Sequence, residues 1–309
     1  MKTTKTLALL ILLFITPFIG ISQNFEKITL DSSDPTNYYL VVKPSAQVRG
    51  VMVLLPGFGG VPENIFPETK LHNTAYVNGI MTVALGVGNK VYADKPVVDK
   101  INNVLKDVVT RFSVSPENFV MGGFSAGGTI SLRYVQLSVE KPAEFPVKFK
   151  GVFTVDSPID LVDIFKYFER ELEKNFSDAG VNEAKFVKDI MLREIGSPTT
   201  DLEAYKKLTP FYKENEGYGN EKFLKDIAVR AYHDIDVSWQ HNNRRRSLYD
   251  CNCLNSSEMI NRLMLMGNER AEFIQSKTRG IRSSGQQHPH SWSIVDEVEA
   301  IQWMDKLFN

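Results

Sequence analysis

Residues 121–128 of the chain are MGGFSAGG, with one serine, Ser125, between two glycines that each lie two positions away. An apolar strand pattern precedes the segment and a helical pattern begins near Ala126, so we predict a sharp strand–turn–helix transition at the serine. Gly123 and Gly127 carry no Cβ and therefore leave room for strand and helix to approach closely. The turn would hold the hydroxyl at a helix N-terminus, whose amides favour developing negative charge. The pattern predicts a nucleophile; a serine in a glycine-rich bend without chemistry is the alternative.

The rest of the sequence alternates strand patterns with helix patterns. Continuous apolar runs, typical of strands buried on both faces of a sheet, lie within residues 37–45, 49–60, 79–88, 117–125, 150–158, 227–234 and 271–276. Apolar residues at helical spacing predict helices over residues 96–112, 126–137, 258–266 and 294–308. This alternation predicts an α/β fold with a mostly parallel, doubly wound sheet and helices on both faces. Ligands bind such sheets at the carboxyl ends of the strands.

One interval, from about residue 161 to 225, breaks the alternation. It has no strand pattern and contains short amphipathic helical segments. A structureless loop of that length is improbable in a compact domain, so we expect a helical insertion, or cap, packed over the sheet edge before the penultimate strand. At 309 residues the chain is long enough for one large core or two modest ones. We expect one domain over residues 23–309, with a separate second domain as the alternative.

The first 22 residues have the anatomy of a signal peptide. Two lysines precede an apolar stretch from Leu7 to Phe18, and small residues follow up to Ser22. A membrane span is the alternative, but it needs about 20 apolar residues, and this run is shorter and contains Pro17. We therefore expect export to the periplasm or the medium, with no stable membrane anchor after cleavage behind Ser22.

Net charge and cysteine content limit the kinds of partner, anchor and metal site that we expect. The formal net charge of −1 gives no reason to expect nucleic acid as a partner, because nucleic-acid binders usually have a basic excess. Cys251 and Cys253 are the only cysteines, so none is available at the cleavage site for a lipid anchor. A disulfide across one residue is strained, and no further metal-ligating side chains cluster there. We expect buried free thiols and no metal, with a strained or intermolecular disulfide as the alternative.

A serine hydroxyl is a weak nucleophile unless a histidine takes its proton and a carboxylate orients that histidine. The chain has five histidines. Two of them, His288 and His290, lie in GQQHPHSW, between the predicted last strand and the last helix. That loop is at the cleft end of the predicted sheet, so these two histidines are the candidate bases.

Three motifs now resemble the α/β-hydrolase superfamily: GFSAG around Ser125, LLPGFGG at residues 54–60, and HSW at residues 290–292. The resemblance covers essentially all of the mature chain and is closest in style to secreted bacterial esterases, in which the catalytic histidine is commonly followed by x-Trp. It implies that His290 is the base, with His288 as the alternate or as a residue that orients the loop.

The resemblance places the catalytic acid after the penultimate strand, where AVRAYHDIDVSWQ offers Asp234 and Asp236. We prefer Asp236, because Asp234 directly follows the strand and is well placed to cap a turn, whereas Asp236 lies deeper in the loop. Asp156, after the strand GVFTVD, is the third candidate, because some members of the superfamily carry the acid one strand earlier. All three preserve the chain order Ser, Asp, His.

For the oxyanion hole, the resemblance implies the backbone amides of Phe58 and Ala126. Pro56 departs from the superfamily's usual pattern, in which a histidine often precedes this glycine. The basic run at residues 244–246 is more typical of a solvated helix face than of an anion site. Trp239 and Trp292 lie beside the two proposed catalytic loops. We expect both to pack in support of the site rather than to stack on substrate.

These features together imply an exported serine hydrolase that cleaves carboxylic esters through Ser125, His290 and Asp236 and an acyl-enzyme. That chemistry requires no metal or organic cofactor. A small-molecule ester, carbohydrate-linked esters included, is the substrate that the resemblance implies. A lipase or serine peptidase on the same fold stays open, as does a catalytically inactive binding protein that keeps the scaffold. The sequence does not determine the oligomeric state.

Overall fold

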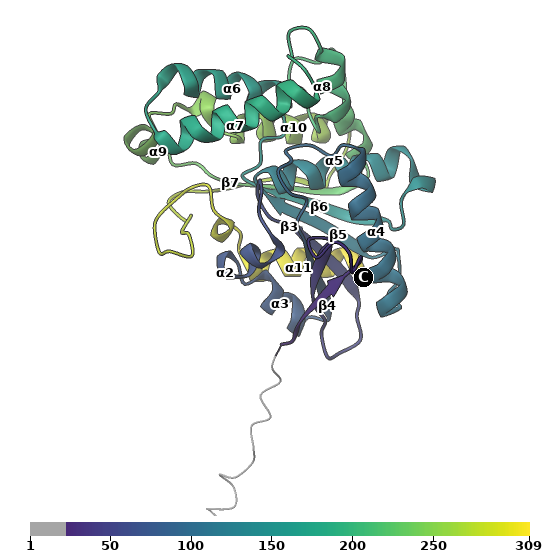
Figure 1. Cartoon of the computed structure of the whole chain (residues 1–309). Helices are drawn as coiled ribbons and strands as arrows, with labels where there is room; N and C mark the ends of the chain where they lie inside the picture. Colours follow the sequence, from purple (N-terminus) through teal and green to yellow (C-terminus); the bar gives the residue numbers. More distant parts are fainter. Residues whose placement is uncertain (1–22) are drawn as a thin grey trace, which may run out of the picture.

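The structure, a computed structural model, describes residues 23–309, and these form one eight-stranded sheet with helices on both faces (Figure 1). The strands are β1 (Phe25–Thr29), β2 (Tyr38–Val42), β3 (Gly50–Leu55), β4 (Ile80–Leu85), β5 (Phe119–Phe124), β6 (Phe149–Val155), β7 (Ala228–Asp234) and β8 (Ala271–Ser276). Their order across the sheet is β1-β2-β4-β3-β5-β6-β7-β8. β2 pairs antiparallel with β1 and β4, whereas all pairs from β4 to β8 are parallel. The predicted mostly parallel α/β sheet is confirmed.

The α-helices are α2 (Ile65–Glu68), α3 (Leu71–Val77), α4 (Lys95–Phe112), α5 (Ala126–Glu140), α6 (Leu161–Lys174), α7 (Asp178–Glu194), α8 (Leu202–Leu208), α9 (Val237–Arg244), α10 (Cys253–Leu265) and α11 (Glu297–Phe308). Short 3₁₀ helices are η1 (Pro62–Asn64), η2 (Pro142–Glu144), η3 (Asn220–Leu224), η4 (Leu248–Asp250) and η5 (Trp292–Ile294). The helices predicted over residues 96–112, 126–137, 258–266 and 294–308 correspond to α4, α5, α10 and α11.

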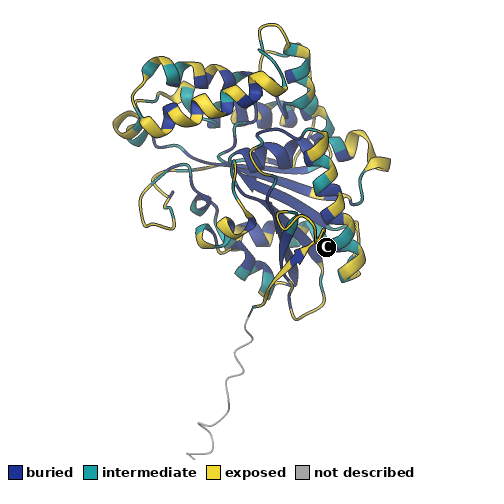
Figure 2. Cartoon of the chain, viewed as in Figure 1, coloured by how far each residue is buried: buried dark blue, intermediate teal, exposed yellow. Residues whose placement is uncertain are grey.

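The central strands are buried on both faces because side chains alternate between two apolar layers. In β3, Val51, Val53 and Leu55 pack with α4, α5 and α10, whereas Met52 and Leu54 pack with α3 and α11. Figure 2 shows the central strands of the sheet as a buried layer between helices whose outer sides are exposed. Two apolar cores, one on each face, therefore fix the carboxyl ends of the parallel strands in place.

Helix α4 illustrates how local sequence sets an element. Asp94 caps its N-terminus by accepting a hydrogen bond from the backbone amide of Val97 at 3.1 Å, and Pro96 lies in the first turn. Ile101, Leu105 and further apolar residues at helical spacing are buried against the sheet. The cap and the apolar face together determine where the helix starts and which side it buries.

Between β6 and β7 the chain forms α6, α7, α8 and η3, which we call the cap (residues 161–224). The three α-helices lie together on one side of the sheet (Figure 1). Asp160 caps α6, and Phe165 and Phe168 pack with Met191 of α7 in an apolar cluster separate from the two sheet cores. The cap therefore has its own small core while remaining inserted between two neighbouring strands.

The predicted signal peptide, residues 1–22, lies outside the described residues. Within residues 23–309, no helix combines the length and the apolar character needed to cross a membrane.

The two cysteines lie at the start of α10 as free thiols, with Cys253 buried and Cys251 partly exposed. Asn252 between them donates a hydrogen bond from its side chain to the backbone carbonyl of Asp156 at 2.9 Å. This segment is thereby attached to the loop that follows β6.

Candidate active site

Ser125 occupies a strained turn between β5 and α5. Its φ of 54° and ψ of −127° lie in a region that non-glycine residues rarely adopt. The turn is held on both sides: the Ser125 amide donates to the carbonyl of Val155 at 2.9 Å, and the Ser125 carbonyl accepts from the amide of Gly128 at 3.0 Å. A strained serine that the surrounding hydrogen bonds hold in place is the geometry expected of a presented nucleophile.

The glycines around the serine are required by close backbone approach. A Cβ on Gly123 would lie 2.3 Å from the carbonyl carbon of Gly127. A Cβ on Gly127 would lie 2.2 Å from the carbonyl oxygen of Pro56. Strand β5, helix α5 and the loop after β3 therefore meet where only glycine fits, and the expectation drawn from the sequence pattern is confirmed.

His290 lies in the loop between β8 and η5. Its Nδ1 is 2.6 Å from Oδ2 of Asp156, and its ring packs 4.4 Å, centroid to centroid, from that of Phe124, the residue before Ser125. All three side chains line one cavity with Ser125. With Nδ1 bonded to a carboxylate, Nε2 is the imidazole nitrogen left for proton transfer.

Asp156 follows β6 directly and has a positive φ of 44°. Its two carboxylate oxygens are divided between two histidines: Oδ2 bonds His290, and Oδ1 lies 2.9 Å from Nδ1 of His233. Burial alone would raise the pKa of Asp156, but its contacts with His290 and His233 outweigh burial and hold that pKa below its usual range. The carboxylate is therefore ionised and able to orient His290.

His233, on β7, is a site residue to which the sequence analysis gave no role. It is 1% exposed, and its ring stacks on Phe273 with centroids 5.3 Å apart. Its Nε2 is buried without a hydrogen-bond partner in the described part of the chain. A neutral imidazole with the proton on Nδ1 fits this setting, because it donates to Asp156 and leaves no buried N–H unpaired. The available signal was a histidine near the cleft end of a buried strand.

The structure does not bring the preferred acid, Asp236, to a histidine. Asp236 is the N-cap of α9: Oδ1 accepts from the amide of Trp239 at 2.9 Å, and Oδ2 from the side chain of Gln287 at 3.3 Å. The other alternative, Asp234, accepts from Gly280 N at 2.9 Å and from a serine hydroxyl. Both carboxylates hold loops at the cavity wall, and of the three candidates it is the third, Asp156, that bonds a histidine in the structure.

The two residues expected at the oxyanion hole, Phe58 and Ala126, both line the cavity beside Ser125. Ala126 is the first residue of α5, where backbone amides have no intrahelical acceptor. The ring of Phe58 packs edge-on against Phe186 of α7 at 5.9 Å. The loop after β3 therefore contacts the cap as well as the turn at Ser125.

His288, the alternate base, is bonded within its own loop. Its Nδ1 faces the backbone amide of His290 at 3.2 Å, and its Nε2 faces Nη2 of Arg244 at 3.3 Å. Burial, followed by the charges of Arg282, His290 and Arg244, lowers the pKa of His288 to about 3. The imidazole is therefore neutral, and it supports the loop that carries His290.

The two tryptophans named in the sequence analysis also pack against the site. Trp292 is buried with its ring 5.9 Å from that of Phe124, and Trp239 lies 4.6 Å from the ring of His288. Both contacts fit the expected packing role.

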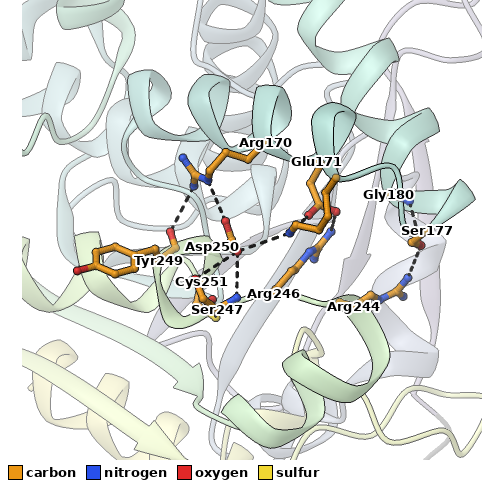
Figure 3. Close-up of polar contacts among 11 residues, drawn as sticks. Arg170, Glu171, Ser177, Gly180, Arg244, Arg246, Ser247, Tyr249, Asp250 and Cys251 are labelled. Carbon is orange, nitrogen blue, oxygen red and sulfur yellow. Dashed lines mark hydrogen bonds and ion pairs between the residues drawn. The ribbon is translucent and has the colours of Figure 1, made fainter.

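The cavity has a volume of about 380 Å³. Its floor is the end of the sheet with Ser125, and its roof includes Ile164, Phe168 and Val187 from α6 and α7. Polar contacts join the cap to the segment after α9 (Figure 3). Arg246 bonds Glu171 at 2.9 Å, and Arg170 bonds Asp250 of η4 at 2.9 Å. The cap and the segment after α9 thus both line the space above the serine.

Comparison with known proteins finds no family model that matches the chain, and no curated protein matches it in sequence. Solved structures do match in fold. Carboxyl esterase 2 of the fungus Tuber melanosporum is 16% identical with a TM-score of 0.58, over 94% of this chain and 88% of that one. The fluorophosphonate-binding serine hydrolase F of Staphylococcus aureus is 13% identical with a TM-score of 0.56, over 92% and 99%. A carboxylesterase of Lactobacillus plantarum is 14% identical with a TM-score of 0.54, over 92% and 97%. With its strand order, nucleophile-type turn and these neighbours, the chain has the α/β-hydrolase fold.

Proposed function

We propose that this protein is a serine hydrolase that cleaves carboxylic esters, with Ser125 as nucleophile, His290 as general base and Asp156 as the acid of the triad. The observation that carries the proposal is the 2.6 Å bond between His290 Nδ1 and Asp156 in the cavity that contains the strained Ser125. The esterases and serine hydrolases among the fold neighbours support the same chemistry, although the fold alone does not imply it.

In the first half-reaction, Ser125 Oγ attacks the ester carbonyl carbon while His290 Nε2 takes the hydroxyl proton. Asp156 holds the imidazole in the tautomer with hydrogen on Nδ1 and stabilises the imidazolium that forms. The backbone amides of Phe58 and Ala126 donate to the tetrahedral oxyanion, and one such donor contributes about 3 kcal/mol to transition-state stability. His290 then gives its proton to the alcohol oxygen as the C–O bond breaks, leaving an acyl-Ser125.

The second half-reaction repeats these roles with water. His290 takes a proton from the attacking water, the same amides hold the second oxyanion, and the protonated imidazole returns its proton to Ser125 Oγ as the acid leaves. The neutral His288 keeps the His290 loop in place in both halves.

The cavity sets the expected substrate size. A volume of about 380 Å³ under an apolar roof suits a small ester better than a long acyl chain or a polypeptide, which supports an esterase over a lipase or peptidase. Export is proposed on the sequence of residues 1–22 alone.

The experiment that tests the proposed function is labelling of the purified protein, residues 23–309, with a fluorophosphonate probe, beside the variant Ser125→Ala and hydrolysis of short 4-nitrophenyl esters. Labelling of the wild type that is absent in Ser125→Ala, together with ester hydrolysis, supports the proposal. Well-folded wild-type protein that neither labels nor hydrolyses any ester overturns it and favours a binding role for the cavity.

A further inference from the structure

Arg282 is a charged cavity residue without a carboxylate partner. It lies in the loop after β8, where a tight turn fixes its backbone through bonds from Arg282 N to Gln286 O at 2.9 Å and from Gly285 N to Arg282 O at 2.8 Å. Its guanidinium lies 5.1 Å from the ring centroid of Phe124, next to Ser125 in sequence. Among residues 23–309, no carboxylate lies within ion-pair distance of it, and burial lowers its pKa. The cavity wall thus carries a partly desolvated cation without an ion-pair partner, on which the charges of Glu68 and Asp156 act only from beyond ion-pair distance.

Arg244, at the end of α9, is also short of acceptors. Nη1 donates to Ser177 Oγ at 3.1 Å, and Nη2 faces Nε2 of His288 at 3.3 Å. The other nitrogen of His288 faces the amide of His290. A neutral imidazole has one acceptor nitrogen, so it cannot accept from both donors. In the described part of the chain, Arg244 likewise has no carboxylate within ion-pair distance.

The neighbouring charged side chains have hydrogen-bond or ion-pair partners or are exposed. Arg246 is paired with Glu171 at 2.9 Å, and Arg245 is exposed and donates to a backbone carbonyl. On the acidic side of the cavity wall, Asp234 and Asp236 accept hydrogen bonds from loops, and Asp250 is paired with an arginine. Two wall carboxylates remain: Glu183 is exposed on α7, and Asp156 is bonded to His233 and His290.

The two arginines act on one region of the cavity. Both depress the pKa of His288, which Arg244 contacts at 3.3 Å, and the positive charge of Arg244 also acts on Arg282. The guanidinium fork offers paired N–H donors that match the planar geometry of a carboxylate. A carboxylate bound here would supply the acceptors that both side chains lack and would sit close to the ester carbonyl at Ser125.

We propose that Arg244 and Arg282 form a subsite for a carboxylate carried by the ester substrate. The proposal rests on the proposed hydrolase function and deepens it: the substrate class is an ester that bears a free carboxylate in its acyl or its alcohol part. Both positions present the same chemistry to the two guanidiniums.

Two matched substrate pairs distinguish the positions. For the alcohol part, 4-acetoxybenzoate is compared with the neutral 4-acetoxybenzamide. For the acyl part, 4-nitrophenyl 4-carboxybenzoate is compared with its 4-carbamoyl counterpart. Each kcat/KM is divided by the rate of the uncatalysed reaction, so that leaving-group differences cancel. We expect a preference of about tenfold or more for the charged member of at least one pair, as charge-assisted hydrogen bonds provide.

The variants Arg244→Gln and Arg282→Gln should each reduce the preference for the charged ester several-fold. Arg245→Gln, a change at the exposed neighbouring residue, is the control and should retain the wild-type preference. Hydrolysis of charged and neutral esters at equal normalised rates overturns the subsite and leaves the hydrolase intact. If no ester is hydrolysed, benzoate and benzamide are titrated into the wild type and both variants. Benzoate binding that the variants lose supports the subsite independently of activity, and binding that they keep overturns it.

Discussion

The imidazole of His290 bonds the carboxylate of Asp156 across 134 positions of sequence, Nδ1 to Oδ2 at 2.6 Å. The partner is the aspartate that directly follows β6, not Asp234 at the end of β7 or Asp236 two residues later. Since parallel strands end at the same edge of the sheet, carboxylates after β6 and β7 both lie at the cleft. The path of the loop after β8 decides which one receives the histidine.

Asparagine at position 156 should remove most of the activity. Asp156→Asn keeps the shape but cannot stabilise the imidazolium and favours the wrong tautomer of His290, which costs roughly 10³–10⁴-fold in kcat in such triads. Asp236→Asn, the matched control, alters a helix cap and should cost about 1 kcal/mol of stability or less with a much smaller change in kcat. Steady-state kinetics on a 4-nitrophenyl ester compares them. A larger loss in Asp236→Asn than in Asp156→Asn would reverse the assignment of the acid.

His233 should act as a positioning residue for Asp156. Replacing it with phenylalanine keeps the stack on Phe273 but removes the donor to Oδ1 of the carboxylate. A lost hydrogen bond to a charged group costs about 1.5–3 kcal/mol, so we expect kcat to fall about 10- to 100-fold with KM little changed. Asparagine can donate from Nδ2 close to where histidine Nδ1 lies, so His233→Asn should recover part of the loss.

The pair of variants separates positioning from packing. If His233→Asn loses as much kcat as His233→Phe while both variants keep the wild-type melting temperature, restoring a donor has no effect. The hydrogen bond to Asp156 then has no role in positioning. If both variants instead lose kcat only in parallel with a loss of stability, His233 has a packing role in the core alone.

Local sequence patterns predicted the sheet and the turn at Ser125 because both depend on residues close together in the chain. Apolar runs define the central strands, and the glycines on either side of Ser125 permit one sharp turn. β1 was missed because it is an edge strand with four of its five residues exposed, so it has no apolar run.

The choice of the acid could not be made in the same way, because it depends on a short helix that the sequence analysis overlooked. α9 begins directly after Asp236, and its free N-terminal amides take that carboxylate. The sequence signal for this role of Asp236 was an aspartate placed directly before a helix of eight residues. The roles of His233 and Arg282 depend on contacts between distant segments, which no local pattern carries.

Alanine at position 127 should damage the nucleophile turn. The added Cβ would lie 2.2 Å from the backbone oxygen of Pro56, so α5 must shift away from the loop after β3. Such overpacking costs typically about 1–3 kcal/mol, and the shift should move Ser125 relative to the amide of Phe58. Gly217→Ala is the matched control, since its Cβ meets nothing within 4 Å although its φ of +75° is strained.

Fluorophosphonate labelling rates at equal folded fractions should fall steeply for Gly127→Ala and stay near wild type for Gly217→Ala. Equal labelling of the two variants would mean that the close approach at Gly127 does not position the serine.

His72 should make the folded protein sensitive to mild acid. It is 5% exposed beside Phe66, and burial, followed by the charge of Lys70, lowers its pKa to about 4. In the unfolded chain a histidine titrates near pKa ~6.5, so between these values the unfolded state binds more protons and stability falls as the pH falls. From pH 7 to 5 the contribution of this one residue is about 2 kcal/mol. Urea unfolding should therefore show that the wild type loses about that much more stability than His72→Phe over this range. The exposed His241 provides the control: His241→Phe should retain the wild-type slope, and an equally steep slope in His72→Phe would show that other groups set the acid sensitivity.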